Sequence, residues 1–231
     1  MEPNLSPRPT ILEWSAIELR GVDAGDFLQS QVSQDVARDS GDGVWTLLLQ
    51  PDGTVLTSSR LQRLDDGYRL VVPRGLAVAS YERLRRFHRR TNCSLDLVRE
   101  VDGPFTTRSE QIDARWPLEG EYALALPPQS YGARFVEATV SFDKGCFTGQ
   151  ELVARLDARG AHVPWRLAYV QGPTIERVVA VAASRGPATR PPVTTWETVD
   201  EGVRALAIVH RTVLEPDHLA SFNDVHVTPV P

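Results

Sequence analysis

The order of short alternating segments in the first hundred residues is the strongest constraint on the fold. Stretches in which apolar and polar residues alternate are interrupted by two stretches with helical spacing and by turn-forming residues. The predicted strands are 16–20, 44–49, 54–64, 68–72 and 94–101, and the predicted helices follow Asp23 and Pro73. This β-α-β-β-β-α-β order predicts an α+β layer, with helices packed on a largely antiparallel sheet.

The C-terminal part has a different pattern, in which only strands are predicted. These strands are 165–171, 176–183, 193–199, 203–210 and 225–230. Short strands closed by turns predict a small C-terminal β-barrel. Residues 102–128 contain several prolines and are predicted to be irregular. We therefore expect two domains, residues 1–162 and 163–231.

Composition excludes several classes of protein. The chain has 231 residues, 42% of them hydrophobic, so it can bury a core. Its net charge of −5 provides no overall field that would attract nucleic acid. No apolar run approaches the ~20 residues of a membrane span, and the first residues lack the pattern of a signal peptide. Two cysteines form neither a disulfide framework nor a zinc set. We expect a cytoplasmic protein with no membrane contact and no bound metal.

Residues 143–155 have the sequence DKGCFTGQELVAR and contain the only lysine of the chain, Lys144. Every other long cationic side chain is arginine. Arginine evidently serves wherever any cation suffices, so this position is predicted to need a compact ammonium whose pKa can move. An ammonium beside the thiol of Cys146 would favour the thiolate, the form that attacks electrophiles.

A helix is predicted to follow this cysteine. Thr148 and Glu151 have the spacing of a capping box, so the helix should run from Thr148 to about Arg159, with Gly160 closing it. Cys146 would then lie where free N–H groups and the helix dipole stabilise an anion. The alternative is a buried structural cysteine, with Thr148 and Glu151 acting only as caps.

The remaining residues of the stretch support the same interpretation. Gly145 and Gly149 would let the backbone turn tightly and approach a ligand. Glu151 and Arg155 are four residues apart on the predicted helix and should pair. Arg155 could also hold an anion near Cys146. A Lys144→Arg change is expected to impair function with little loss of stability.

Residues 144–155, KGCFTGQELVAR, resemble the K-G-C-[YF]-x-G-Q-E-x-x-[AS]-R motif of the YgfZ family. These folate-binding proteins of iron–sulfur cluster maintenance and tRNA modification are related to the glycine-cleavage T-protein. Residues 19–36 resemble the N-terminal region of the family, and the likeness covers the first hundred residues and then 110–231. It implies that Cys146 and Lys144 are the reactive pair. The other motif residues that it implies are Gly145, Phe147, Thr148, Gly149, Gln150, Glu151 and Arg155.

The resemblance also implies a T-protein-like folate-binding domain followed by a small β-barrel. Family members carry a second α/β unit between the first sheet and the cysteine motif, where it helps to line the folate cavity. Only residues 102–128 occupy that place here. The chain therefore resembles a shortened member of the family.

Tetrahydrofolate is the cofactor that this resemblance implies, and three residues are candidates for holding it. Recognition should need a carboxylate for the pterin edge, a cation for the glutamate tail and an apolar slot. Arg115 and Trp116 lie in a stretch that resembles the family's Arg-Ile-x-x-Gly-x-Pro, although Gln111 replaces its arginine and Arg115 its glycine. Gln31 is expected to face the cavity, and the alternative for it is a solvated helix end.

Four functions remain open. The first is a folate-dependent accessory protein for assembly or repair of iron–sulfur enzymes and associated tRNA modification, acting through the Cys146 thiolate. The second is a one-carbon transferase of the aminomethyl type. The resemblance implies an aspartate after the turn at 51–53 for such transfer, but residues 57–59 read Thr-Ser-Ser. The third is a cysteine hydrolase, which needs a histidine base within hydrogen-bond distance of Cys146, whereas the nearest histidine in sequence, His162, lies at the far end of the predicted helix. The fourth is a binding module without chemistry.

The expected partners are iron–sulfur enzymes or their assembly machinery, with tRNA involved at most indirectly. Residues 81–90 predict a basic helix face that could meet tRNA phosphates, and the alternative is a solvated face. The oligomeric state is left open. Whether the chain is an enzyme is also left open, with a one-carbon transferase as the enzymatic alternative.

Overall fold

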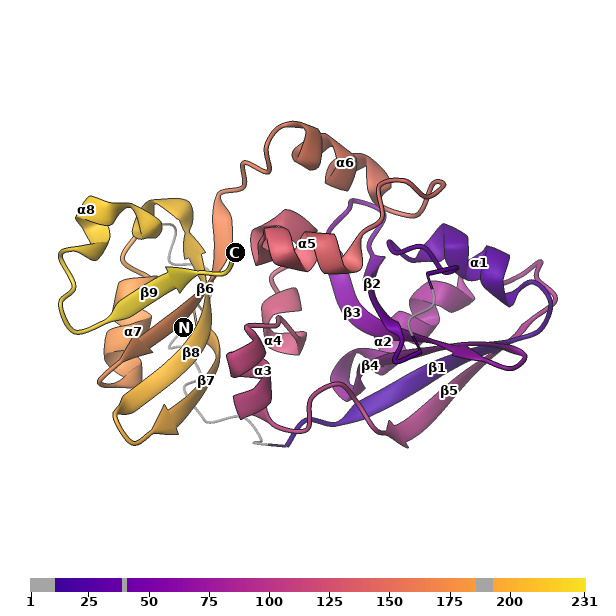
Figure 1. Cartoon of the computed structure of the whole chain (residues 1–231), viewed down its shortest axis with the longest axis horizontal. Coiled ribbons are helices and arrows are strands. Elements are labelled where there is room, and N and C mark those ends of the chain that lie inside the picture. Colours follow the sequence, from indigo (N-terminus) through magenta and orange to yellow (C-terminus); the bar gives the residue numbers. More distant parts are fainter. Residues whose placement is uncertain (1–10, 39–40, 186–192) are drawn as a thin grey trace.

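The computed structural model describes residues 11–38, 41–185 and 193–231 (Figure 1). The N-terminal half forms a five-stranded sheet of order β2-β3-β4-β1-β5, in which all neighbouring strands are antiparallel. Its strands are β1 (Trp14–Arg20), β2 (Val44–Leu49), β3 (Val55–Leu64), β4 (Gly67–Pro73) and β5 (Ser94–Val101). The predicted element order and the antiparallel sheet are confirmed. Period-2 alternation and turn-forming residues were sufficient here because each strand pair on the β2–β4 side is a local hairpin.

Two helices, α1 (Ala24–Gln31) and α2 (Arg74–Arg85), cover one face of this sheet. Phe27 and Leu28 of α1 and Leu84 of α2 pack with Ile17 and Leu48 of the sheet. The opposite sheet face carries the side chains Trp14, Leu47, Leu49 and Val71. This second face is covered by the middle segment of the chain.

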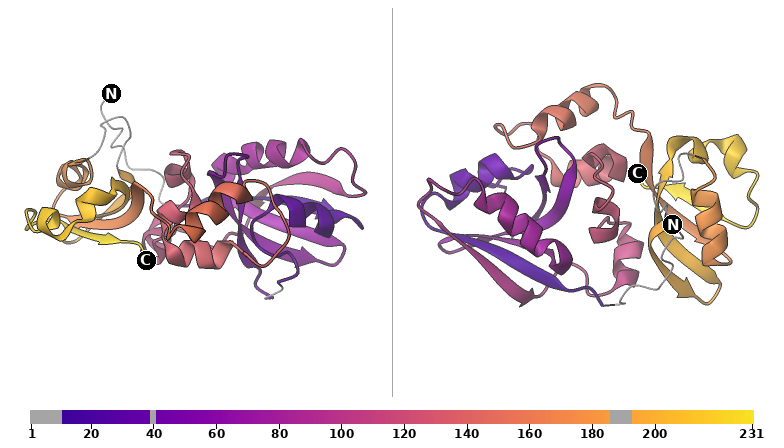
Figure 2. Two further views of the ribbon diagram at one scale, coloured as in Figure 1. Left: turned by 90° about the horizontal axis from the view of Figure 1, so that it is seen from above. Right: turned by 180° about the vertical axis from the view of Figure 1, so that it is seen from behind.

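The middle segment contains short helices, and the prediction that residues 102–128 are irregular is wrong for 108–114 and 119–122. It forms α3 (Arg108–Ala114), α4 (Glu119–Tyr122), the 3₁₀ turn η1 (Pro128–Tyr131) and α5 (Ala133–Thr139). Thr107 and Glu110 make a complete capping box at the start of α3. That Thr-x-x-Glu spacing was present in the sequence, but the surrounding prolines concealed it. Figure 2 shows these helices lying between the two sheets.

The C-terminal part forms a four-stranded antiparallel sheet of order β7-β8-β6-β9. Its elements are β6 (Trp165–Gly172), α7 (Ile175–Ala182), β7 (Val193–Val199), β8 (Gly202–His210), η2 (Arg211–Leu214), α8 (Pro216–Leu219) and β9 (His226–Pro229). Among the described residues no pairing joins β7 to β9, so the sheet is open and the predicted barrel is not confirmed. The predicted strand 176–183 is wrong. Thr174 caps a helix there, and Val178, Val181 and Ala182 lie on its buried face.

One hydrophobic core joins the two sheets through the middle helices. It includes Trp14 and Leu47 of the first sheet, Phe135 of α5, and Leu167 and Leu206 of the second sheet. The domain boundary near residue 162 lies in the connection between α6 (Gln150–Ala158) and β6, and it stays a prediction. None of the helices in the described ranges is both long and apolar enough to cross a membrane.

Candidate functional site

The cysteine motif forms a loop that is bound to α1 and leads into α6. The helix begins at Gln150, with Gly149 as its N-cap residue and no side-chain cap. The predicted capping box of Thr148 and Glu151 is therefore wrong. The backbone N–H of Thr148 donates instead to the carbonyl of Ser30, 3.2 Å away at the end of α1. Gly160 follows the helix in a left-handed conformation, as predicted.

Gly149 is required by the close approach of two backbones. Its φ of +83° is unfavourable for other residues, and a Cβ atom there would lie 2.7 Å from the carbonyl oxygen of Gln50 and 3.1 Å from Gly53. The motif loop is thus pressed against the turn between β2 and β3. The motif backbone turns tightly at Gly149, as predicted. It approaches the turn between β2 and β3 closely, whereas the sequence led us to expect a close approach to a ligand. A Cβ at Gly145 would meet no atom of the described residues within 4 Å.

Lys144 binds the last turn of α1 and the segment that follows it. Its ammonium donates to the carbonyl oxygens of Gln29 (2.7 Å), Val32 (2.7 Å) and Gln34 (3.1 Å). An ammonium has three N–H donors, and all three are used. The nitrogen also lies 5.3 Å from the centre of the buried Phe147 ring. The structure therefore gives a physical reason for lysine that differs from the expected one: a compact ammonium can meet three converging carbonyls.

This arrangement predicts an unusual titration of Lys144. Burial lowers its pKa to about 8, and the nearby Asp35 carboxylate opposes that change. Because Lys144 is the only lysine, ¹⁵N-lysine labelling gives a single side-chain signal in NMR spectra. We expect that signal to titrate near pH 8, and an Asp35→Asn change to lower the midpoint further. A midpoint at the ordinary value of 10.5 in the folded protein would contradict the burial of this ammonium.

The lowered pKa of Lys144 also makes the free energy of unfolding depend on pH. Between pH 8 and 10.5 the unfolded chain holds a proton that the folded chain has released. The free energy of unfolding that depends on Lys144 should therefore rise with pH across this window. Urea unfolding at several pH values, compared with a Lys144→Met variant, isolates this contribution from other groups that titrate there.

Cys146 is exposed to solvent, which contradicts the alternative of a buried structural cysteine. It lies three residues before Gly149, the N-cap residue of α6, so its predicted position ahead of that helix is correct. His162 lies beyond the other end of α6, where its Nδ1 contacts the carbonyl of Arg159. Glu151 and Arg155 form the predicted pair, but at 4.0 Å between exposed groups it adds little stability.

A cavity of about 540 Å³ opens beside the first residues of the motif. Its walls are one side of α5, residues 141–143 and the end of α6, with Arg38, Gln129 and Arg166. Gln129 is 3% exposed and donates from Nε2 to the carbonyl of Val153 at 2.9 Å. In the described part of the chain, its Oε1 and the Nε–H of Arg166 have no hydrogen-bond partner. Two buried polar atoms of this cavity are thus available to a ligand or to water.

Gln31 belongs to a separate polar group. It is buried, accepts from Nη1 of Arg83 at 3.1 Å and donates to Ser30 Oγ at 2.9 Å. Arg83 is also buried, and its Nε donates to the carbonyl of Leu49 at 3.3 Å. Burial lowers the pKa of Arg83, with a further contribution from Arg86. Residues 81–90 are therefore not a uniformly solvated basic face, because Arg83 points inward.

Arg115 and Trp116 lie together on the other face of the sheet, away from Gln31. Both line a cavity of about 290 Å³ beside the C-terminal residues. The Arg115 guanidinium lies 5.1 Å from the Tyr169 ring, and Trp116 packs 4.4 Å from Trp45 between ring centres. The three predicted folate candidates are therefore not brought into one site.

The strand after the turn at 51–53 is closed to solvent. Thr57, Ser58 and Ser59 are fully buried. Ser58 Oγ accepts from Trp116 Nε1 at 3.2 Å and donates to the Tyr122 hydroxyl at 2.8 Å, because the single proton of that hydroxyl goes to the carbonyl of Pro117 at 2.6 Å. The place where the resemblance implies an aspartate thus carries a hydroxyl beneath two aromatic side chains.

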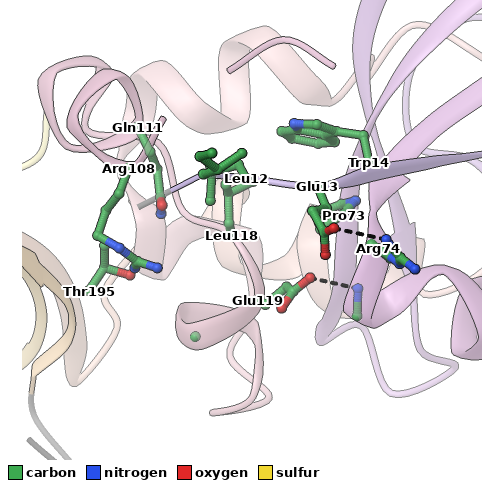
Figure 3. A pocket seen from close by; sticks show the side chains of 13 residues that line it. Leu12, Glu13, Trp14, Pro73, Arg74, Arg108, Gln111, Leu118, Glu119 and Thr195 are labelled. Atoms are coloured by element: carbon green, nitrogen blue, oxygen red, sulfur yellow. Dashed lines mark hydrogen bonds and ion pairs between the residues drawn. The ribbon is translucent and has the colours of Figure 1, made fainter. Parts of the chain in front are cut away.

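Another cavity, of about 650 Å³, was not predicted from the sequence (Figure 3). Leu12, Trp14 and Leu118 form its apolar walls. At one end Glu13 pairs with Arg74 at 2.9 Å, and Glu119 accepts from the N–H of Gly75 at 2.8 Å. Glu119 thereby supplies the first turn of α2 with the acceptor that Pro73 cannot provide. No local pattern reveals this contact because the two residues are far apart in the sequence.

One comparison with known proteins, that with solved structures, shows the fold. No family model matches the chain. A curated relative, an "Uncharacterized protein" from Haemophilus influenzae (strain ATCC 51907 / DSM 11121 / KW20 / Rd), is 26% identical over 195 residues, covering 66% of this chain and 69% of the relative. Among solved structures, the glycine cleavage system aminomethyltransferase T from Bartonella henselae is similar with a TM-score of 0.60 at 13% identity. That match covers 88% of this chain and 78% of the other. The chain therefore has an aminomethyltransferase T-like fold, and membership of the YgfZ family stays a prediction.

Proposed function

We propose that this chain is a folate-binding accessory protein for iron–sulfur enzymes that acts through the Cys146 thiol and does not transfer an aminomethyl group. The observation that carries the proposal is the placement of Cys146. The thiol is exposed on a loop anchored by Lys144 on one side and Gly149 on the other. An anchored, accessible sulfur is suited to holding a reactive group in a defined position, and Asp143, three residues before Cys146, lines the cavity at the start of the motif.

The cavity beside the motif contains the groups that a reduced folate needs. Arg38 and Arg166 can bind the carboxylates of the glutamate tail, and Asp143 or Glu137 can accept from the pterin edge. Val136 and Val140 provide an apolar wall for the aminobenzoyl ring. Oε1 of Gln129 and the Nε–H of Arg166, which have no partner within residues 11–38, 41–185 and 193–231, fit a ligand that carries both donors and acceptors. Bound tetrahydrofolate would supply a carrier for a one-carbon unit.

Aminomethyl transfer is disfavoured by the buried strand 57–59. Ser58 has no carboxylate, and its hydroxyl is already bonded to Trp116 and Tyr122. Burial raises the pKa of Tyr122 well above its ordinary value, so this phenol stays neutral and offers no base. A role in assembly or repair of iron–sulfur enzymes requires only the exposed thiol and the bound folate. Any effect on tRNA modification would be exerted through those enzymes.

Calorimetry with 5-formyltetrahydrofolate tests the cofactor. We expect binding by the unmodified protein and at least roughly tenfold weaker binding by Arg166→Gln, because one charge-assisted hydrogen bond contributes about 1.5–3 kcal/mol. Arg99→Gln, which changes an exposed arginine of β5, is the matched control and should bind normally. No heat at millimolar ligand would exclude folate from this protein.

The thiol is tested separately from the cofactor. In a strain that lacks the gene, Cys146→Ser should fail to restore iron–sulfur enzyme activity while still binding 5-formyltetrahydrofolate in vitro. Full restoration by Cys146→Ser would favour a binding module without thiol chemistry.

A further inference from the structure

The second cysteine of the chain lies next to a histidine. Cys93 follows α2 in the loop that leads to β5, and its sulfur is 3.3 Å from Nε2 of His88. Neither side chain is fully buried. A nucleophile within hydrogen-bond distance of an imidazole is the arrangement that activates thiols in proteins. The sequence alone did not indicate this pair, because four residues of loop separate the two side chains.

Several contacts hold the pair in position. The Phe27 ring meets the imidazole edge-on, with 5.6 Å between ring centres. The Thr91 hydroxyl donates to the carbonyl of His88 at 3.0 Å, and its oxygen can accept from the Cys93 thiol at 3.6 Å, farther away than His88 Nε2. The loop is also bound to α1, since the N–H of Asn92 donates to the Asp23 carboxylate at 2.6 Å. His88 is therefore the group placed to take the proton of Cys93.

The surroundings of the pair are cationic. Arg86, Arg89 and Arg90 are exposed, and in the described part of the chain none of them has an ion pair. Asp23 is a carboxylate bonded to the loop, through the N–H of Asn92. Three unpaired arginines raise the local concentration of small anions.

We propose that Cys93 and His88 form a second thiol site, distinct from the cysteine motif, that forms a mixed disulfide with a small anionic disulfide. In the reaction His88 Nε2 takes the proton of the Cys93 thiol. The thiolate then attacks one sulfur of the small disulfide, a new S–S bond forms and the original S–S bond breaks. The departing thiolate leaves with the electron pair and takes the proton from His88. Cys93 is oxidised, and the small disulfide is reduced to one thiol and one protein-bound sulfur.

The unmodified protein provides the first test. After exposure to oxidised glutathione, peptide mass spectrometry should find the adduct mainly on Cys93, although Cys146 is the more exposed cysteine. An adduct confined to Cys146 would overturn the proposal. Because folate is not needed for this reaction, the result is independent of the proposed cofactor.

Variants then identify the base. In a Cys146→Ser background, 5,5′-dithiobis(2-nitrobenzoate) should react with Cys93 at least roughly tenfold faster than after an additional His88→Gln change, because a positioned base contributes about 10²-fold or more in favourable cases. His226→Gln, at an exposed histidine of β9, is the matched control and should leave the rate unchanged. Equal rates with and without His88, in variants whose thermal unfolding is unchanged, would refute the role of the imidazole.

The arginines are tested by the charge of the reagent. The ratio of rates for the dianionic 5,5′-dithiobis(2-nitrobenzoate) and the uncharged 4,4′-dithiodipyridine should fall about threefold in Arg89→Gln/Arg90→Gln and should fall with added salt in the parent. A ratio that neither change affects would refute the preference for anionic disulfides.

Discussion

Replacing Glu121 with alanine should lower the free energy of unfolding by about 3–5 kcal/mol, the largest effect expected of a single change in this chain. Glu121 is fully buried, and its carboxylate accepts four hydrogen bonds. Two come from the middle segment, from the N–H of Leu118 at 2.8 Å and from Gln111 Nε2 at 3.3 Å. The other two come from the hydroxyls of Thr194 and Thr195, the latter at 2.8 Å.

The magnitude follows from what the alanine would leave behind. Leu118 N–H and the Thr195 hydroxyl would lose an acceptor, at about 1–3 kcal/mol each. The missing side chain would also leave a cavity. Because both threonines belong to β7, the carboxylate joins α4 to the C-terminal sheet. Hydrogen exchange should therefore accelerate in β7 as well as in α4.

Glu121→Gln is the matched control for this change. The amide keeps the shape and one oxygen acceptor, and the threonine hydroxyls can rotate to accept from its NH₂ group. We expect a loss of about 1–2 kcal/mol, measured by urea unfolding with an unchanged dependence on urea. A loss below about 1 kcal/mol for alanine, with unchanged hydrogen exchange in β7, would show that the hydrogen bonds of Glu121 do not hold α4 to the C-terminal sheet.

The second large effect is expected at Lys144. A Lys144→Met change should destabilise the protein by about 2 kcal/mol, because hydrogen bonds to a charged group are worth about 1.5–3 kcal/mol when buried and less when half-buried. Three carbonyls, of Gln29, Val32 and Gln34, would lose their donor. The motif loop would then be released from α1, so amide exchange should accelerate at residues 145–149.

Lys144→Arg separates shape from charge. The donors of a guanidinium form a planar fork, which cannot direct three N–H groups to three converging carbonyls. We now expect this variant to lose stability and to loosen the motif loop as Lys144→Met does, in place of the small loss of stability that the sequence suggested. Arg155→Met changes an exposed residue of α6 and should cost no more than about 0.5 kcal/mol. Normal stability and normal amide exchange of the loop in Lys144→Arg would show that the three carbonyls do not require lysine. An effect on the Cys146 thiol would then be the remaining reason for lysine at this position.

Local sequence patterns were sufficient for the first sheet. Alternating residues with turns at 51–53 and 65–67 predicted strands and helices close to their observed bounds, because each hairpin brings together residues that are near in sequence. The position of Cys146 ahead of a helix and the closing role of Gly160 were also predicted correctly, since both depend on backbone geometry within a few residues.

Predictions from local patterns were wrong where the apolar residues of a segment fit both the helical and the strand period. They were also wrong where prolines flank a short helix. Valine-rich residues 176–183 have strand propensity, but packing of Val178 and Val181 against the second sheet makes them a helix. Thr148 had the spacing of a capping residue, but its N–H is taken by Ser30 and the helix begins two residues later.

The roles of the polar side chains were decided by the tertiary structure. The sequence showed that Lys144 is singular but not that its partners are three carbonyls more than a hundred positions away. No sequence pattern predicted that Glu121 and Arg83 are buried, or that the Cys93 sulfur contacts His88. Hydrophobic periodicity is a property of neighbouring residues, whereas the partner of a buried polar group is chosen by whichever distant segment the fold brings within hydrogen-bond distance.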